Sequence, residues 1–141
     1  MLLPALDAFP EERELHKAAR QLLYENSGVT VCQAALGEAL SVLSERLKVA
    51  DFDTVMTRLY KHIEARRITV YGNGPHNCET LDLASKLHFD EPNLKPTDAL
   101  IIAAACTDKA LELVTMDEFA EWETVRNWTD IHHVKIRGFG G

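Results

Sequence analysis

The chain has 141 residues, of which 46% are hydrophobic and 26% are charged, which is the ordinary composition of one globular domain. Its formal net charge of −7 argues against indiscriminate binding to nucleic acid, because non-specific affinity comes mainly from lysine and arginine side chains that neutralise phosphates. No apolar run approaches the roughly 20 residues that span a bilayer, and the first residues lack the order of a signal peptide. We therefore expect a single domain over residues 1–141, located in the cytoplasm.

The first half of the chain alternates between helix and strand patterns. In three segments apolar residues recur at helical spacing, and glutamates at the start of the first segment favour a helix N-terminus there. Short runs rich in β-branched residues lie between the helical segments and are typical of strands. Asp51 is the expected N-cap of the third helix, and Glu38 falls in the second turn of the second. In order, the patterns predict a helix over 11–26, a strand over 29–32, a helix over 33–48, a helix over 51–67 and a strand over 68–71.

The second half continues the alternation. Asp98 opens a run of small and aliphatic residues that is too apolar for a surface helix, and Asp117 follows an extended apolar run. Strands and helices that alternate in this way predict an α/β protein with a mostly parallel sheet. The predicted elements are a turn at 72–75, a helix over 79–88, a loop over 89–96, a helix capped by Thr97 and Asp98, a strand over 111–114 and an edge strand over 131–137.

Three acids are candidates for one site. Glu38 and Asp117 both follow strand ends, which meet at one edge of a parallel sheet, and Asp98 can join them from the start of its helix. Clustered carboxylates repel one another unless a cation neutralises them. Oxygen ligands suit Mg²⁺ or Mn²⁺ rather than zinc, so the pattern predicts a Mg²⁺ or Mn²⁺ site.

Each of these residues also has a plainer interpretation. Glu38 can be a solvated carboxylate on a helix face, Thr97 and Asp98 can serve only as a helix cap, and Thr115-Met116-Asp117 can be only a turn after a strand. A single nucleic-acid strand would need a basic rim. The alternative is that its candidate cations simply lie on a solvent-exposed helix face. The candidates are Arg58, Lys61, Arg66, Arg67, Lys86 and Lys95.

The cysteines, histidines and tryptophans suggest no second site. Cys32, Cys78 and Cys106 have spacings unlike a zinc motif and are expected to be reduced core residues. His132 and His133 would point to opposite faces of a strand and so cannot chelate one ion. Trp122 and Trp128 could stack on nucleic-acid bases. The favoured interpretation is that they pack in the core or in a dimer interface.

Residues 11–119 resemble a PIN-domain nuclease of the PilT N-terminus-like group, to which the VapBC-type toxin ribonucleases belong. The resemblance rests on Asp98-Ala99 before an apolar run, on Thr115-Met116-Asp117 closely followed by Phe119, and on Glu38 in a helix that follows a strand. It implies a three-layer α/β/α fold with strand order 3-2-1-4-5. It also implies a metal-dependent endoribonuclease that cleaves single-stranded RNA and leaves a 5′-phosphate and a 3′-hydroxyl.

The resemblance also assigns roles and partners. Asp98 and Asp117 would be direct or water-bridged ligands of Mg²⁺ or Mn²⁺, Glu38 a further ligand or the base that orients water, and Thr115 would hold a ligand or a phosphate oxygen through its hydroxyl. The implied biology is the toxin of a toxin–antitoxin pair. Such a toxin forms a homodimer and is inhibited by an antitoxin protein that inserts a basic side chain into the acidic pocket.

The start of the chain departs from this pattern. Residues 1–6 resemble the segment that follows the first strand of the family, so that strand and its Asp are missing, and we expect the natural polypeptide to begin upstream. Asp7 lies on a helix or turn near Phe9 and Pro10 and is not expected to replace the missing acid. A second function therefore stays open, that of a catalytically degenerate PIN-like module that binds RNA or protein. A strand ending in Asp upstream of Met1 would favour the enzyme.

Overall fold

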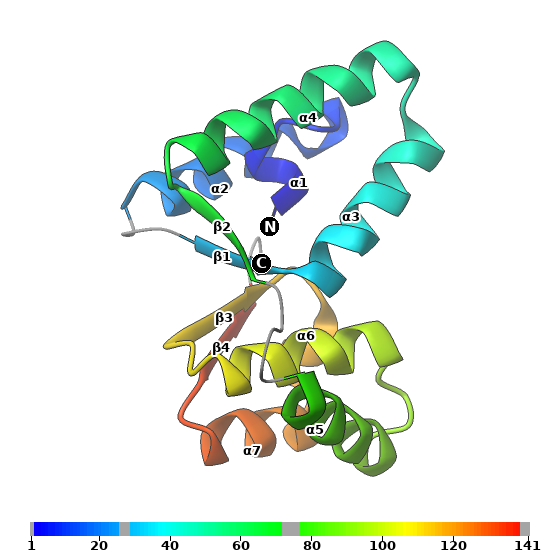
Figure 1. The fold of residues 1–141 in the computed structure, drawn as a ribbon, viewed down its shortest axis with the longest axis vertical. Helices are drawn as coiled ribbons and strands as arrows, with labels where there is room; N and C mark the ends of the chain where they lie inside the picture. The colour runs from blue at the N-terminus through cyan, green and yellow to red at the C-terminus, as the bar shows by residue number, and fades with distance from the viewer. Residues whose placement is uncertain (1, 26–28, 72–76, 139–141) are drawn as a thin grey trace. The chain divides into compact units, whose positions relative to one another are not determined.

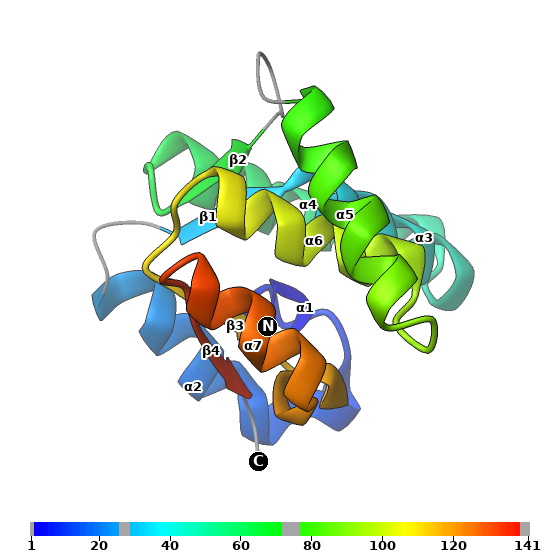
Figure 2. The ribbon, with the colours of Figure 1, turned by 90° about the horizontal axis from the view of Figure 1, so that it is seen from below.

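The computed structural model describes residues 2–25, 29–71 and 77–138, and it confirms an α/β chain with short parallel strands. Two compact units divide the chain, Met1–Gly72 and Asn73–Gly141, and each is described by itself (Figure 1). Each unit contains one pair of parallel strands with helices between and around them (Figures 1 and 2). The predicted turn at 72–75 lies outside the described residues.

The first unit is built around the parallel pair of β1 (Val29–Cys32) and β2 (Ile68–Tyr71). The pair is in register from Val29 opposite Ile68 to Cys32 opposite Tyr71, and both predicted strands are confirmed at their predicted bounds. The other elements of this unit are α1 (Leu2–Ala5), η1 (Pro10–Glu12), α2 (Arg13–Glu25), α3 (Gln33–Arg46) and α4 (Val49–Glu64).

The helices of the first unit bury aliphatic side chains at helical spacing. Leu23, Leu43 and Leu59 are each at most 3% exposed, and Ile68 of β2 is 1% exposed. The predicted cap of α4 is wrong, because Lys48 is its N-cap and Asp51 lies in the first turn. An acid is still favourable there, since the N-terminus of a helix carries a partial positive charge.

The second unit pairs β3 (Glu112–Thr115) with β4 (Lys135–Gly138), again in parallel. Its helices are α5 (Asn77–Asp90), α6 (Pro96–Thr107), η3 (Glu118–Glu121) and α7 (Glu123–Ile131). Side chains of all these helices meet in one core, in which the largest buried residues are Leu87, Leu94, Ile102, Phe119, Val125 and Val134.

The last part of this unit differs from its prediction. The expected edge strand over 131–137 is confirmed only from Lys135 onward, because α7 continues to Ile131 and β4 covers Lys135–Gly138. His132 is the C-cap of α7, and His133 has a φ of 59°, so the two histidines lie in a helix end rather than on a strand. Trp122 and Trp128 are partly buried against the core, as predicted.

The three cysteines occupy three different environments. Cys106 is buried in the core, and burial raises the pKa of its thiol to about 11, which keeps it in the unreactive thiol form. Cys32 is half-buried with a pKa that burial also raises. Cys78 is exposed on α5, so its prediction as a core residue is wrong.

Candidate functional site

Thr115 and Asp117 form a local hydrogen-bonded turn at the end of β3. The Thr115 hydroxyl oxygen accepts a hydrogen bond from the backbone N–H of Asp117 at 3.1 Å, and its O–H lies 3.2 Å from Asp117 Oδ2, to which it donates. Thr115 is buried, whereas Asp117 is exposed. The turn therefore presents a carboxylate to solvent while a buried hydroxyl fixes its orientation.

A hollow of about 410 Å³ opens at the carboxyl ends of β3 and β4. Gly138 ends β4 directly opposite Thr115 and has no side chain to fill this edge. The lining residues combine apolar, acidic and basic groups: Met116, Asp117, Ala120, Glu121, Arg126, Ile136, Arg137 and Gly138. This edge of a parallel pair is where α/β proteins commonly bind ligands.

Two arginines contribute positive charge to the hollow that contains Asp117. Arg126 donates from Nε to the Ala120 carbonyl at 2.9 Å and from Nη2 to Glu121 at 2.7 Å. Arg137 donates from Nε and Nη2 to Glu112 at 3.0 and 2.8 Å. Among the described residues, the contacts of each guanidinium thus use Nε and Nη2 and not Nη1. Neither arginine could be assigned to this site from the sequence, because their proximity to Asp117 depends on the pairing of β4 with β3.

The four predicted site residues are divided between the two units. Asp98, Thr115 and Asp117 belong to the second unit, and Glu38 belongs to the first, where it is exposed in the second turn of α3. Asp98 is half-buried in the first turn of α6, whose N-cap is Lys95 without a side-chain cap bond, so the predicted capping role of Thr97 and Asp98 is wrong. Within 2–25, 29–71 and 77–138, no group of three His, Cys, Asp or Glu side chains is arranged to hold a metal ion.

Several residues of the predicted basic rim have structural contacts instead. Arg58 donates to the carbonyl oxygens of Leu6 and Asp7 at 2.9 and 3.1 Å. Arg67 donates from Nε to His62 Nδ1 at 2.9 Å, and Lys86 pairs with Asp82 at 2.8 Å. These contacts favour a structural role for the three cations.

Asp7 forms a turn, as predicted. Its φ is 53°, and its carboxylate pairs with Arg20 at 2.7 Å and with His16 at 3.2 Å. Both ring nitrogens of His16 face acceptors, since Nε2 lies 3.0 Å from the Phe9 carbonyl oxygen. Asp7 is thus engaged in holding the N-terminal segment onto α2.

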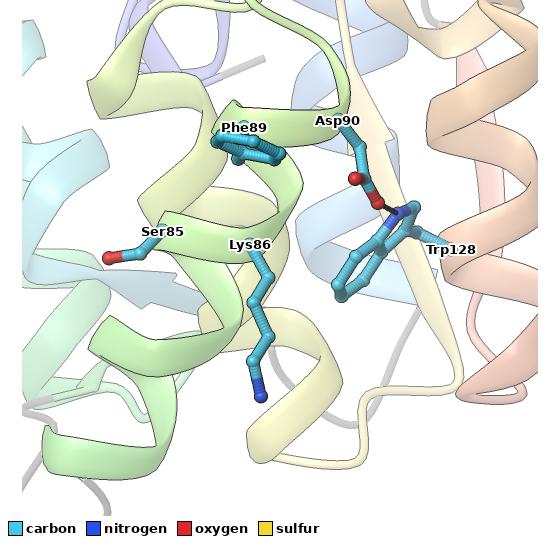
Figure 3. A pocket seen from close by; sticks show the side chains of 5 residues that line it. All are labelled: Ser85, Lys86, Phe89, Asp90 and Trp128. Carbon is cyan, nitrogen blue, oxygen red and sulfur yellow. Dashed lines mark hydrogen bonds between the residues drawn. The ribbon is translucent and has the colours of Figure 1, made fainter.

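A second hollow, of about 420 Å³, lies on the surface of the same unit, between α5 and α7 (Figure 3). It is lined by Ser85, Lys86, Phe89, Asp90 and Trp128. Trp128 Nε1 donates to Asp90 Oδ2 at 3.1 Å, which fixes one wall. Its lining contains one acid, Asp90, and one base, Lys86, whereas the Asp117 hollow is lined by two of each.

No helix in the described ranges combines the length and the apolarity that a membrane span requires. No protein-family model, curated protein or solved structure significantly matches the chain.

Proposed function

We propose that the chain is a metal-dependent endoribonuclease that hydrolyses phosphodiester bonds of single-stranded RNA. The observation that carries the proposal is the Thr115–Asp117 turn, which fixes a carboxylate at the carboxyl end of a parallel strand, in a hollow that also contains two arginines. A phosphodiester hydrolase needs both an acid set that binds a cation and donors that bind phosphate.

The strand pairing agrees with a PIN-type arrangement. In the order 3-2-1-4-5, removal of the central first strand leaves two separate parallel pairs. β1 and β2 form one such pair and would be strands 2 and 3 of that order. β3 and β4 form the other pair and would be strands 4 and 5. We propose the three-layer α/β/α fold on this basis, with residues 1–141 as one domain of that kind.

Carboxylate oxygens from Asp98, Asp117 and Glu38 form the proposed ligand set, and their chemistry fits Mg²⁺ or Mn²⁺. Such an ion would lower the pKa of a bound water and neutralise charge on the phosphate oxygens. Asp117 would bind it with an orientation held by the Thr115 hydroxyl. Glu38 would be a ligand or the base that orients the attacking water, and Asp98 a direct or water-bridged ligand.

The arginines complete the proposed site from the other side. Arg126 and Arg137 would each donate from Nη1 to a phosphate oxygen while keeping the contacts that position Nε and Nη2. Surface ion pairs such as those with Glu121 and Glu112 contribute at most about 1 kcal/mol. Binding a phosphate with the same guanidinium groups would therefore cost little free energy, even if these ion pairs weakened.

By the same resemblance we propose the biological role of a toxin in a toxin–antitoxin pair, acting as a homodimer in the cytoplasm. The second candidate function is a degenerate PIN-like module that binds RNA or protein without cleaving it. The observation that favours this alternative is that the described residues contain no three-ligand metal group.

The test is cleavage of single-stranded RNA with Mg²⁺ or Mn²⁺, with EDTA as the blank. We expect metal-dependent cleavage that falls by about two orders of magnitude or more in Asp117→Asn, because that change removes a charged ligand and keeps the side-chain shape. Asp130→Asn, an exposed acid on α7, is the matched control and should keep full activity. A folded protein that binds RNA but does not cleave it would favour the degenerate module.

A further inference from the structure

One exposed face of α2 carries a row of cations that ends in a tyrosine. Arg13, Lys17, Arg20 and Tyr24 are four, three and four residues apart, and all four are exposed. At 3.6 residues per turn, this spacing keeps the four positions within an arc of roughly 60° around the helix axis. These four residues form the α2 stripe, and the side chains that α2 buries lie elsewhere on the helix.

The acids of α2 lie beside the stripe rather than on it. Glu14 and Glu25 are roughly a quarter turn around the axis from its centre. Arg20 pairs with Asp7 through Nη1 at 2.7 Å, but its side chain is still 44% exposed, so it keeps donors for a further anion. A chain with a net charge of −7 thus has three cations on one helix face. Such a local row attracts a polyanion that the net charge alone would repel.

Tyr24, at the end of the stripe, is held in place from one side. The guanidinium carbon of Arg67 lies over one face of the Tyr24 ring, 4.9 Å from its centre. Arg67 is fixed in turn, because its Nε donates to His62 Nδ1 at 2.9 Å. The His62 ring meets Tyr24 nearly edge-on, with the ring centres 6.3 Å apart. Tyr24 is nevertheless 62% exposed, so the ring face away from Arg67 is accessible to a flat partner.

The combination of cations and ring indicates which polyanion fits. Along the axis the four residues are about 6, 4.5 and 6 Å apart, steps comparable to those between successive phosphates of an extended single strand. A membrane-binding helix would present several apolar side chains on this face, and Tyr24 is the one aromatic or aliphatic residue of the stripe. A duplex keeps its bases paired and stacked. A single strand uses both the cations and the ring.

We propose that the α2 stripe binds single-stranded RNA, with its phosphates on the three cations and one unpaired base stacked on Tyr24. Arg67 is a positioning residue that holds the ring from the other side. The inference rests on single-stranded RNA as the substrate of the proposed function. It does not depend on metal binding or on cleavage at the end of β3.

The salt dependence of RNA binding tests the cations. Binding of a fluorescein-labelled oligouridylate is measured by anisotropy, with Ca²⁺ in place of Mg²⁺. Arg13→Gln and Lys17→Gln should each weaken binding several-fold and reduce the slope of log affinity against log salt by about 0.7, because one phosphate contact is lost. Lys48→Gln is the matched control, since this exposed lysine begins α4 about 20 Å along the axis from His62, which contacts Tyr24. It should leave the slope unchanged.

Tyr24 variants test the stacked base. Tyr24→Ala should weaken binding about tenfold with no change in the salt slope, because a base contact and not a phosphate contact is lost. Tyr24→Phe keeps the ring and should bind like the wild type. Tyr60→Ala is the matched control and should also bind like the wild type. Tyr60 is 54% exposed in the same unit and lies roughly 160° around α4 from His62.

The outcomes separate this inference from the proposed function. A wild-type chain that does not bind the oligouridylate would refute the inference, as would normal binding by folded Tyr24→Ala and Lys17→Gln variants. Binding to vesicles of phosphatidylcholine and phosphatidylserine, lost in Lys17→Gln and without any RNA binding, would assign the stripe to a membrane surface and overturn it. RNA binding that depends on the stripe in a chain that cleaves no RNA would support the inference and count against the nuclease.

Discussion

His62 is a buried histidine that the fold holds in its neutral form. It is 8% exposed, and its Nδ1 accepts a hydrogen bond from Arg67 Nε at 2.9 Å. Burial lowers the pKa of His62 below 6.5, and the charge of Arg67 lowers it further, while Asp7 acts in the opposite direction. Protonation of Nδ1 would destroy the acceptor and place two positive charges in contact.

This arrangement predicts that the free energy of unfolding decreases as the pH is lowered. Because the unfolded chain binds a proton at His62 more readily than the folded chain, the contribution of His62 is complete above pH 6.5 and is lost as the pH falls below that value. Urea unfolding on either side of pH 6.5 measures the effect. His62→Asn, which keeps an acceptor but cannot titrate, should flatten the pH dependence. His133→Asn, an exposed histidine at a φ that asparagine tolerates, should not.

Helix ends are the elements at which this chain is most unusual. Among the described residues, four helices, α1, α4, α6 and α7, are followed by a left-handed residue that is not glycine, with φ between 53° and 61°. In α6 the N–H of Lys109 bonds to the Cys106 carbonyl at 3.3 Å and the N–H of Ala110 to Ala105 at 3.0 Å, the pattern of a Schellman motif. The left-handed residues of the other three helices are Asp7, Arg66 and His133.

A glycine at one of these ends should stabilise the protein. Lys109→Gly removes the steric cost of a Cβ at a φ of 55° and should raise the free energy of unfolding by about 1 kcal/mol. The adjacent Asp108 has a φ of −77°, so Asp108→Gly only adds flexibility to the unfolded chain and should lower stability. Thermal unfolding of the two variants checks the prediction. Equal effects of the two changes would contradict it.

Some elements could be predicted from the sequence and others could not, and one of these helix ends accounts for a failure. The strands at 29–32 and 68–71 were predictable, because short β-branched runs lie between strongly periodic helices. The edge strand over 131–137 was predicted to start too early, because no glycine marks the end of α7 and His132 to Val134 close that helix before β4 begins at Lys135. Strand pairing cannot be read from either strand alone, which is why the two arginines beside Asp117 were missed.

At the scale of the whole molecule, the net charge of −7 means that the proposed binding of RNA must rest on local cations. Arg126→Gln and Arg137→Gln should each weaken binding of a single-stranded RNA about tenfold, measured with Ca²⁺ in place of Mg²⁺. Each should also reduce the slope of log affinity against log salt by about 0.7, because one phosphate contact is lost. A purely structural role would leave that slope unchanged.

Lys86→Gln is the matched control for these variants. It removes one positive charge from the same unit at a residue that lines the other hollow. We expect its salt slope to equal that of the wild type. A similar loss of slope in Lys86→Gln would show that binding follows net charge rather than the Asp117 hollow.

The parallel pairing of the strands also has a consequence for how the protein is made. β1 and β2 are separated along the chain by α3 and α4, and β3 and β4 are separated by η3 and α7. Pairing across such connections is slow compared with helix formation. During synthesis the backbone N–H and C=O groups of the first strand of each pair therefore stay unpaired for a time, and such strand edges tend to associate with other chains. Slow expression at low temperature is the condition under which we expect the largest yield of folded protein.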